Sequence, residues 1–343
     1  MPKVEKSKAP SMVDVAREAG VGLVTVSRVL NEPDVVRPET RQRVNDAIAR
    51  LGYRRNDLAR ALKSGRSTTV GVVIAGSELF ELPRILRGVE SAAQEAGYWV
   101  NMASWQEGSS EQLVNAVERL ANQAVEGVAI IADRPVAAAA LEQMVARIPI
   151  TVVMSGELAN PSIGSVELDQ EFGARLATEH LLQLGHRRIV HLTGRLGAYD
   201  ARARLAGWQK TMLAAGIHDA QHAEGDFLAG SGFRLTQEIL DAGEHPTAIF
   251  AGNDQMAMGV LSALAQRNVQ VPDDISVVGF DDIAGSEYLV PSLTTVRQDF
   301  VALGRTSVEM LLGMLSGEVP EHRFIAPELV PRASSAPPRV TSL

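Results

Sequence analysis

The 343-residue sequence contains no cysteine. The lack of thiols excludes a disulfide framework, a thiolate metal site and a cysteine nucleophile. No apolar run approaches the ~18 residues that a membrane span needs, and the basic residues 1–8 lead into no apolar signal core. Glycine and proline are near average usage, so the chain is neither collagen-like nor wholly disordered. We therefore expect a folded cytoplasmic protein of two or three domains, at ~100–200 residues each.

Signatures of catalysis are also missing. The sequence has no Gly-x-Gly-x-x-Gly after the first predicted strand, no Gly-Lys-Thr/Ser phosphate loop and no Gly-x-Ser-x-Gly elbow. We therefore expect neither an enzyme nor a cofactor. The histidines His180, His186 and His191 are scattered, which favours structural roles over a metal site. The pair Asp281-Asp282 could hold a metal or act as acid and base, but its setting indicates the end of a buried strand.

The net charge of −8 hides an asymmetry along the chain. Residues 1–66 hold 14 Lys and Arg against 8 Asp and Glu, a net charge of +6, so the remainder has a net charge of −14. A basic head on an acidic body suggests that the head contacts a polyanion and that the body does not.

The basic head contains three predicted helices. Ser11 can cap a first helix that ends at Gly20, a residue able to take a left-handed turn conformation. A second helix covers residues 23–30, and a third begins at Pro38 and runs to about Leu51. Two short helices joined by a tight turn with glycine are typical of the helix-turn-helix unit. A three-helix cap used for protein contacts is the alternative.

In a helix-turn-helix the second helix enters the major groove with its N-terminal residues nearest the bases. Leu23 and Val24 would then contact thymine methyl groups, and Arg28 could reach guanine O6 and N7 or a phosphate. Thr25 and Ser27 are suited to phosphate oxygens.

The acidic body alternates short apolar runs with helical segments, such as those near residues 82–96 and 110–124. The runs expected to be strands are 70–74, 98–102, 127–131, 150–153, 188–192, 248–250 and 275–278. Such runs, bounded by polar turns, predict doubly wound α/β structure with parallel sheets buried on both faces. Roughly 270 residues is large for one such sheet, so we expect two lobes. Ligands of such folds bind at the carboxyl ends of the strands.

Several motifs are shared with one family. Val13-Asp-Val-Ala-Arg-Glu-Ala-Gly, Thr25-Val-Ser-Arg-Val-Leu-Asn, Arg204-Leu-Ala-Gly-Trp and Pro272-Asp-Asp-Ile-Ser-Val-Val-Gly-Phe-Asp-Asp resemble the lactose-repressor/galactose-repressor (LacI/GalR) family of bacterial transcription regulators. The resemblance implies an all-α helix-turn-helix head, a hinge helix and a two-lobed core like that of periplasmic sugar-binding proteins. The segments it implies are a tail (1–10), the head (11–55), the hinge helix and linker (56–68), a first lobe (69–168 and 300–327), a second lobe (169–299 and 328–334) and a tail (335–343).

The hinge segment carries two further DNA contacts by resemblance, Asn56 and Leu62. Leu62 would be an apolar wedge pushed into a base step from the minor groove. A helix this short is marginal alone in water, so it should become ordered only against its symmetry mate and DNA. A plain flexible linker is the alternative.

The same resemblance implies a sugar pocket between the lobes. Arg204 could hold two neighbouring hydroxyls, Asp281 could accept from hydroxyls, and Asn253 could both donate and accept. Phe227 matches an aromatic residue that stacks on the apolar face of the sugar. The remaining matched positions are Gln298, Phe300, Leu79 and Ile85. For Leu79, Ile85 and Phe300, ordinary core packing is an equal alternative.

Three departures from the family pattern affect the DNA and ligand sites. Val24 stands where a polar base-reading residue is frequent, and Glu78-Leu-Phe-Glu81 replaces the frequent Asn-Pro-Phe-Phe loop. Asp200 and Ser155 occupy positions that often touch sugar in the family, so we expect an altered specificity for ring substituents.

The resulting hypothesis is a sugar-responsive, DNA-binding transcriptional repressor, with a galactoside or related glycoside as effector. No leucine heptad follows the last lobe segment, so a homodimer on a palindromic operator is expected. The alternatives are a nucleobase acting as corepressor on the same regulator and, less favoured, a cytoplasmic sugar-binding protein or glycoside enzyme.

Overall fold

The computed structural model describes most of the chain in two compact units, Met1–Ser67 and Thr68–Leu343. The residues it describes are 10–53, 66–76, 81–106, 110–132, 141, 147–153, 158 and 160–339. The predictions for Asn56, Leu62, Leu79, Ser155 and the hinge helix lie outside these residues. Among the described helices, none is long and apolar enough to cross a membrane.

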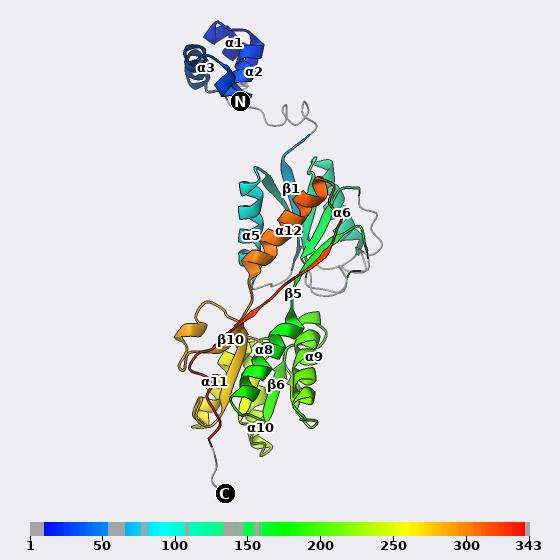
Figure 1. The fold of residues 1–343 in the computed structure, drawn as a ribbon, viewed down its shortest axis with the longest axis vertical. Helices are drawn as coiled ribbons and strands as arrows, with labels where there is room; N and C mark the ends of the chain where they lie inside the picture. The colour runs from blue at the N-terminus through cyan, green and yellow to red at the C-terminus, as the bar shows by residue number, and fades with distance from the viewer. Residues whose placement is uncertain are drawn as a thin grey trace, which may run out of the picture. The chain divides into compact units, whose positions relative to one another are not determined.

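The first unit is a small bundle of helices (Figure 1). Its elements are α1 (Met12–Ala19), α2 (Leu23–Asn31), the short 3-10 helix η1 (Pro33–Val35) and α3 (Pro38–Leu51). Ser11 caps α1 in a reciprocal arrangement with Asp14, and Gly20 ends it with a φ of +64°. These signals lie where the sequence predicted the helix boundaries, because capping hydrogen bonds and a left-handed glycine satisfy the free backbone groups of a helix end.

One apolar core holds this bundle together. Val15 from α1, Val26 from α2 and Val44 from α3 have no exposed surface. The three helices supply these residues from one face each, so the turn between α1 and α2 is fixed by packing as well as by Gly20.

The second unit contains two six-stranded sheets, each the centre of one lobe. In spatial order the first sheet consists of β11 (His322–Ile325), β5 (Gly164–Leu168), β4 (Ile150–Val153), β3 (Gly127–Ile131), β1 (Thr69–Gly76) and β2 (Trp99–Gln106). All of its described strand pairs are parallel. The helices packed on it are α5 (Leu82–Glu95), α6 (Ser110–Asn122) and α12 (Phe300–Leu315).

The second sheet has the same arrangement apart from its last strand. In spatial order it consists of β12 (Glu328–Val330), β10 (Thr294–Arg297), β9 (Ser276–Asp281), β8 (Ala248–Ala251), β6 (Ile189–Thr193) and β7 (His222–Glu224). Its helices are α8 (Gln170–Gln183), α9 (Tyr199–Ala214), α10 (Ala229–Asp241) and α11 (Asp254–Gln266), and a short 3-10 helix, η2 (Ser286–Tyr288), follows β9. Helices α8 and α9 pack against each other, as do α10 and α11. Separate apolar clusters on the two faces of the sheet explain why its central strands are buried throughout.

The chain passes between the lobes three times (Figure 1). It crosses from β5 to α8, returns from β10 to α12, and crosses again from β11 to β12. The predicted two-lobed, doubly wound α/β core is therefore confirmed, and each lobe contains segments distant in sequence.

The C-terminal segment corrects one expectation. Residues 335–343 were expected to form a flexible tail, yet Ser335, Ala336 and Arg339 are bonded to the second lobe. The His186 ring Nε2 lies 2.9 Å from the Ala336 carbonyl oxygen, and Arg339 Nη2 lies 2.8 Å from Asp273 Oδ2. Hydrogen bonds with folded residues thus fix a segment whose composition is typical of a loop.

Candidate DNA-binding surface and effector site

The exposed face of α2 carries the predicted DNA contacts. Leu23 and Val24 are 48% and 66% exposed, whereas Val26 and Val29 on the other side of the helix are buried. Large apolar side chains at the N-terminal end of a helix gain nothing in stability from such exposure. The residues predicted to contact DNA are therefore accessible on this face, and the contact itself stays a prediction.

The polar residues of α2 complete this surface. Arg28 is exposed, and Thr25 and Ser27 are partly exposed. The Ser27 hydroxyl accepts a hydrogen bond from Asn31 Nδ2 at 3.2 Å, and the same nitrogen donates to the Ser27 carbonyl at 2.7 Å. The Arg28 side chain takes no part in these two hydrogen bonds and can extend along the surface of the helix.

In the second lobe, Arg204 is the centre of a buried polar cluster. It lies on α9, and its Nε donates to Gln170 Oε1 at 2.8 Å. Its Nη1 donates to the Gly252 carbonyl at 2.5 Å, and its Nη2 lies 3.4 Å from Asp281 Oδ1. Only 4% of Arg204 is exposed, so these three acceptors take the place of water around its charge.

Asp281 and Gln298 extend this network towards the other lobe. Gln298 Nε2 donates to Asp281 Oδ1 at 2.6 Å, and Gln170 Nε2 donates to Gln298 Oε1 at 2.9 Å. Gln170 begins α8 after the first crossing, and Gln298 follows β10 before the second. The structure therefore brings together three predicted residues, Arg204, Asp281 and Gln298, through Gln170, which the sequence analysis did not select.

Electrostatics distinguish Asp281 from its neighbour Asp282. Burial raises the pKa of Asp281 to about 8, although the Arg204 guanidinium acts to lower it. Asp282 is instead held by Arg297 Nε at 2.7 Å and Arg332 Nη2 at 2.8 Å. The two carboxylates therefore have separate partners, and no group of three or more His, Asp or Glu in the described chain is placed to hold a metal ion.

Asn253 and Phe227 are linked to each other beside this cluster. Asn253 caps α11 by accepting from the Met256 backbone N–H at 2.9 Å, and its Nδ2 donates to the Phe227 carbonyl at 3.1 Å. The Phe227 ring centre is 5.7 Å from the Arg204 guanidinium carbon. Phe227 and Asp281 have φ values of +71° and +104°, which non-glycine residues rarely adopt. Such strained conformations cluster at ligand sites, where the surrounding structure stabilises them.

Comparison with known proteins identifies the family. The model for bacterial regulatory proteins of the lacI family matches residues 11–56, and a periplasmic binding protein-like domain matches residues 178–335. The lactose operon repressor of Escherichia coli strain K12 is 36% identical over 343 residues, covering 97% of this chain and 94% of that protein. The chain belongs to the LacI family.

Further relatives of this LacI-family protein agree. The ribose operon repressor of Escherichia coli strain K12 is 34% identical over 324 residues, which cover 93% of this chain and 94% of that protein. A crystal structure of the lac repressor dimer bound to operator and the anti-inducer ONPF matches with a TM-score of 0.84 and 36% identity, covering 96% of this chain and 100% of that chain. This LacI-family protein is a DNA-binding transcriptional repressor and not an enzyme.

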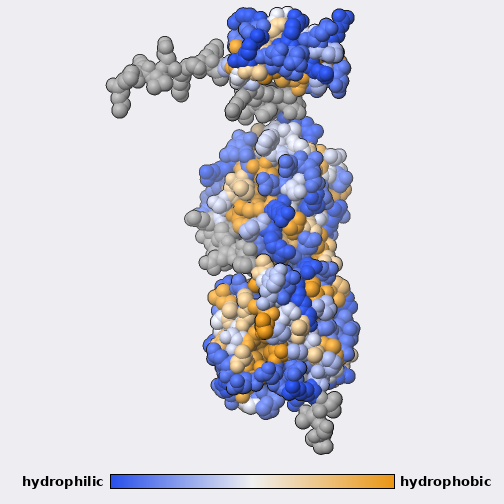
Figure 2. Space-filling model, turned by 90° about the vertical axis from the view of Figure 1, so that its left-hand side faces the viewer, coloured by the Kyte–Doolittle hydropathy of each residue, from blue (hydrophilic) through white to orange (hydrophobic). Residues whose placement is uncertain are grey.

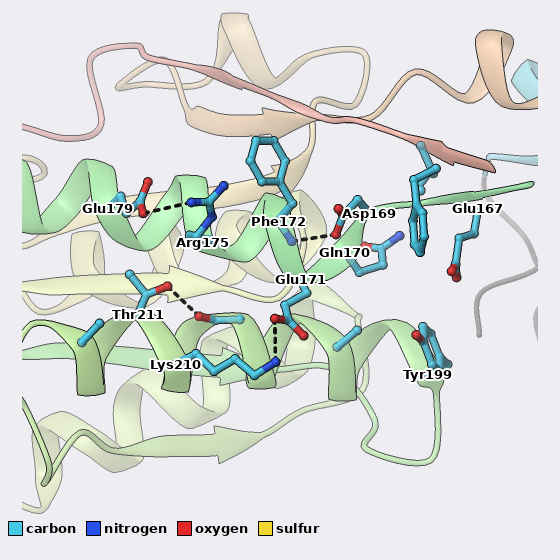
Figure 3. A pocket seen from close by; sticks show the side chains of 15 residues that line it. Glu167, Asp169, Gln170, Glu171, Phe172, Arg175, Glu179, Tyr199, Lys210 and Thr211 are labelled. Atoms are coloured by element: carbon cyan, nitrogen blue, oxygen red, sulfur yellow. Dashed lines mark hydrogen bonds and ion pairs between the residues drawn. The ribbon is translucent and has the colours of Figure 1, made fainter. Parts of the chain in front are cut away.

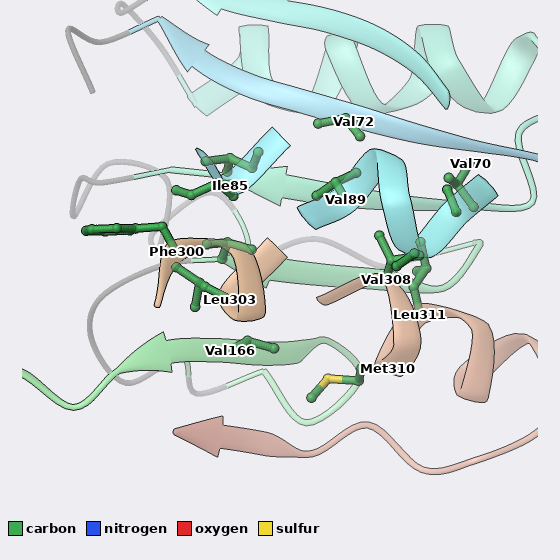
Figure 4. Packing of buried hydrophobic residues seen from close by; sticks show 14 of the residues in the cluster. Val70, Val72, Ile85, Val89, Val166, Phe300, Leu303, Val308, Met310 and Leu311 are labelled. Atoms are coloured by element: carbon green, nitrogen blue, oxygen red, sulfur yellow. The ribbon is translucent and has the colours of Figure 1, made fainter. Parts of the chain in front are cut away.

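Ile85 and Phe300, two of the residues matched to the family's pocket wall, pack in the core of the first lobe. They are 5% and 6% exposed and lie among Val89 and Leu303 (Figure 4). The Arg84 guanidinium carbon lies 5.1 Å from the centre of the Phe300 ring. These contacts give both residues a packing role, and Arg84 places a polar group at the edge of that core.

Two acidic residues at this LacI-family site were missed by the sequence analysis. Glu81, which precedes α5, forms an ion pair with Arg84 at 3.6 Å, and burial raises its pKa. Asp254 at the start of α11 accepts from Ser286 Oγ at 2.6 Å and from Thr295 Oγ1 at 2.5 Å, and burial raises its pKa as well. The only sequence signals were the altered loop that ends at Glu81 and the position of Asp254 directly after Asn253.

A separate groove of about 680 Å³ lies between α8 and α9 (Figure 3). Lys210 and Glu171 pair across it at 2.7 Å, and Phe324 of β11 contributes one wall. The groove shares Gln170 with the buried cluster but is not lined by Arg204 or Asp281. It is therefore a different surface from the effector site expected for a LacI-family protein.

Proposed function

We propose that this repressor responds to a galactoside or related glycoside bound at the cluster of Arg204, Asn253 and Asp281. The observation that carries the proposal is a buried guanidinium and a buried carboxylate held side by side at the carboxyl ends of parallel strands. A sugar offers adjacent hydroxyls that both accept from Arg204 and donate to Asp281. The Phe227 ring beside them supplies an apolar surface for the C–H face of the sugar ring.

The proposed repressor acts as a homodimer on a palindromic operator, because a two-fold protein axis requires two matching half-sites. Support for dimerisation comes from large exposed apolar side chains on the core, and Figure 2 shows hydrophobic patches on one face of both lobes. The most exposed large apolar side chains of the core are those of Trp99, Met102, Tyr288, Val290 and Val319. The similar lac repressor structure is itself a dimer bound to operator.

Control of DNA affinity follows from coupling between the core and the segment that joins it to the head. Glycoside binding changes the position of one lobe relative to the other, and this alters the spacing of the two joining segments in the dimer. Ordering each residue of such a segment costs ~1–2 kcal/mol of backbone entropy, so small changes in spacing change operator affinity strongly. The coupling is reciprocal, so operator DNA weakens glycoside binding by the same factor.

Thermal unfolding tests the effector class. The purified protein is melted with galactosides, glucosides, free hexoses and purines. A specific ligand stabilises the fold by ~2.7 kcal/mol at a hundredfold excess over Kd. A shift with galactosides supports the proposal, whereas a shift with purines alone replaces it by a nucleobase corepressor. The shifting ligand is then added to fluorescence-anisotropy titrations of operator DNA, in which a glycoside effector changes the apparent Kd.

The DNA surface has its own test. Arg28→Ala should weaken binding to specific DNA by about 10- to 100-fold, since a good base contact is worth ~1–3 kcal/mol. Arg187→Ala removes an exposed arginine from the second lobe and is the matched control. Equal effects of the two substitutions would show that overall charge, and not the α2 surface, determines affinity.

A further inference from the structure

The effector cluster carries more acidic than basic side chains. The acidic side chains that act on one another there are Glu81, Asp254 and Asp281, and Asp200 lies one helical turn before Arg204 on α9. The basic side chains are Arg204 at the centre and Arg84, which is paired with Glu81. Three of these carboxylates act on one another electrostatically: Asp254 and Glu81 both act to raise the pKa of Asp281, and Asp254 acts to raise that of Glu81. The site is therefore a poor environment for any additional negative charge.

Asp254 already has donors on both carboxylate oxygens, whereas the partners of Asp281 in the described chain are all on one oxygen. Asp254 accepts from Ser286, from Thr295 and from the Ile283 backbone N–H at 2.9 Å. Asp281 accepts from Gln298, and Arg204 lies beside the same oxygen. Asp254 therefore fixes the loop after β9, and the carboxylates left to meet a ligand alongside Asp281 are Asp200 and Glu81.

Asp200 has a buried oxygen atom without a donor in the described part of the chain. Its Oδ1 has almost no exposed surface and no hydrogen-bond partner there. Asp200 lies in the first turn of α9, four residues before Arg204, so the two side chains share one face of the helix. A buried acceptor without a donor costs about 1–3 kcal/mol. A ligand hydroxyl or ammonium group bound next to Arg204 would satisfy it.

Glu81 contributes from the opposite lobe. Its ion pair with Arg84 is long, at 3.6 Å, and Arg84 also lies over the Phe300 ring. Phe300 begins α12 two residues after Gln298, the donor to Asp281, so Arg84 lies over a residue next to the crossing that also carries Gln298. Its side chain is only 14% exposed. Arg204 of the second lobe acts electrostatically on Glu81 across the boundary between the lobes.

We propose that Glu81 and Asp200 select the effector by charge: they accept hydrogen bonds from its hydroxyl or ammonium groups and exclude ligands that carry a carboxylate or a phosphate. This inference rests on the proposed glycoside site and adds the class of glycoside. Arg204 alone would favour an anion, but its three hydrogen-bonding positions are already directed to Gln170, Gly252 and Asp281. The buried Asp200 oxygen is an acceptor without a donor in the described chain, so the ligand group that meets it must be a donor.

Isothermal titration calorimetry of the full-length protein tests this with four probes of one ring type. The probes are methyl β-galactoside, galactosamine, galacturonate and galactose 6-phosphate. Placing like charges next to one another costs several kcal/mol, so both anions should bind at least about 100-fold more weakly than the methyl galactoside. Galactosamine should bind as tightly as the methyl galactoside or more tightly. Binding of either anion within about threefold of the neutral probe overturns the inference and leaves the glycoside proposal intact.

Substitutions assign the selectivity to the two residues. In Glu81→Gln and Asp200→Asn, the ratio of galacturonate Kd to methyl galactoside Kd should fall by about tenfold. Asp219→Asn is the matched control, because Asp219 is exposed and precedes β7, at the sheet edge opposite the carboxyl ends. An unchanged ratio in both variants, or an equal fall in the control, overturns the inference. If none of the four probes binds to the wild-type protein, the glycoside proposal fails together with it.

Thermal unfolding of each variant separates loss of fold from loss of selectivity. If one variant does not fold, the other still gives the ratio, since Glu81 and Asp200 lie in different lobes.

Discussion

The two lobes of the core have the same strand order, but they contribute different residues to the candidate effector site. In space, the strands of the first sheet have the order β11-β5-β4-β3-β1-β2. The strands of the second sheet have the corresponding order β12-β10-β9-β8-β6-β7. The outermost strands differ in direction, because β11 is parallel to β5 whereas β12 is antiparallel to β10. A common fold therefore leaves open what each lobe contributes to the site.

The second lobe supplies most of the polar chemistry. Arg204, Asn253 and Asp281 are held there by hydrogen bonds that exist without ligand. The first lobe contributes the packed pair Ile85 and Phe300, together with Glu81 at the edge. The second lobe therefore holds most of the predicted site residues in place without a ligand.

Replacing Arg204 should have the largest effect, and it tests whether the second lobe supplies most of the polar contacts to the ligand. Arg204→Ala leaves Gln170 Oε1 and the Gly252 carbonyl without this donor and leaves Asp281 with Gln298 alone, and each buried group left unsatisfied costs about 1–3 kcal/mol. We expect glycoside affinity to fall at least about 100-fold in calorimetry, while operator binding in anisotropy persists. Loss of both activities would indicate misfolding.

Two further substitutions make the Arg204 result specific. Arg204→Lys keeps the charge but not the planar donors, so it should also lose most of the affinity. Arg305→Ala removes an exposed ion pair with Glu95 in the first lobe, and such pairs contribute about 0–1 kcal/mol. A large loss of glycoside affinity in Arg305→Ala would show that the first lobe is as important as the second.

One glycine in a buried strand of each sheet provides a stability comparison. A Cβ at Gly279 in β9 would lie 2.2 Å from Asp254 Oδ1, whereas one at Gly71 in β1 would meet Leu120 Cδ1 at 2.9 Å. Asp254 is fixed by several donors, but a leucine methyl can move. Gly279→Ala should therefore reduce the free energy of unfolding by about 2–3 kcal/mol, and Gly71→Ala by less. Urea unfolding of both variants measures the difference, and a larger loss in Gly71→Ala would contradict the rigid second lobe.

The Phe227 ring offers a smaller and more local test. A Cβ at Gly194 would lie 2.0–2.3 Å from atoms of that ring, so Gly194→Ala must displace it. Losing a stacking contact of about 1.4 kcal/mol would weaken glycoside binding about tenfold without a comparable loss of stability. Calorimetry with methyl β-galactoside measures the effect, and Gly197→Ala, where a Cβ would meet nothing within 4 Å, is the control. Unchanged affinity in Gly194→Ala would remove Phe227 from the site.

Much of this architecture could be predicted from local sequence signals. Ser11, Gly20 and Pro38 marked helix boundaries in the head because caps, left-handed turns and first-turn prolines act through neighbouring backbone groups. Strands β1, β2, β3, β4, β6, β8 and β9 were recognisable as apolar runs, whereas β5 and β10 were missed because buried polar residues interrupt them. The short strands β7 (His222–Glu224), β11 and β12 were also missed, since three or four partly polar residues become a strand only by pairing with a neighbour.

The effector site shows the same limit. Arg204, Asp281 and Gln298 were found through family resemblance, and the structure joins them. Gln170 and Glu81 were not found, because their importance depends on two crossings that place α8 and α5 near the same strand ends. Contacts between residues more than a hundred positions apart leave no local pattern in one sequence.

The smallest expected effect is a difference in pH dependence between the lobes. The raised pKa of Asp281, about 8, means that its contribution to stability is complete below its usual value of 3.8 and is lost as the pH rises towards 8. Burial lowers the pKa of His191 to about 3, so its contribution is complete above 6.5 and is lost as the pH falls. The two effects oppose each other between about pH 4 and 6.5, and between 6.5 and 8 the Asp281 effect continues while the His191 effect is constant.

Urea unfolding at pH 6.5, 7.2 and 8 isolates the Asp281 effect. The free energy of unfolding should fall with pH, by at most about 1.4 kcal/mol per pH unit, because one proton is involved. Asp281→Asn should remove this slope. Glu95→Gln in the first lobe should leave it unchanged, since Arg305 holds the pKa of Glu95 at about 2, far below this range. A slope that survives in Asp281→Asn would mean that another group, and not Asp281, binds the proton. A wild-type protein without a slope would mean that Asp281 is already ionised at pH 6.5 and that Arg204 outweighs its burial.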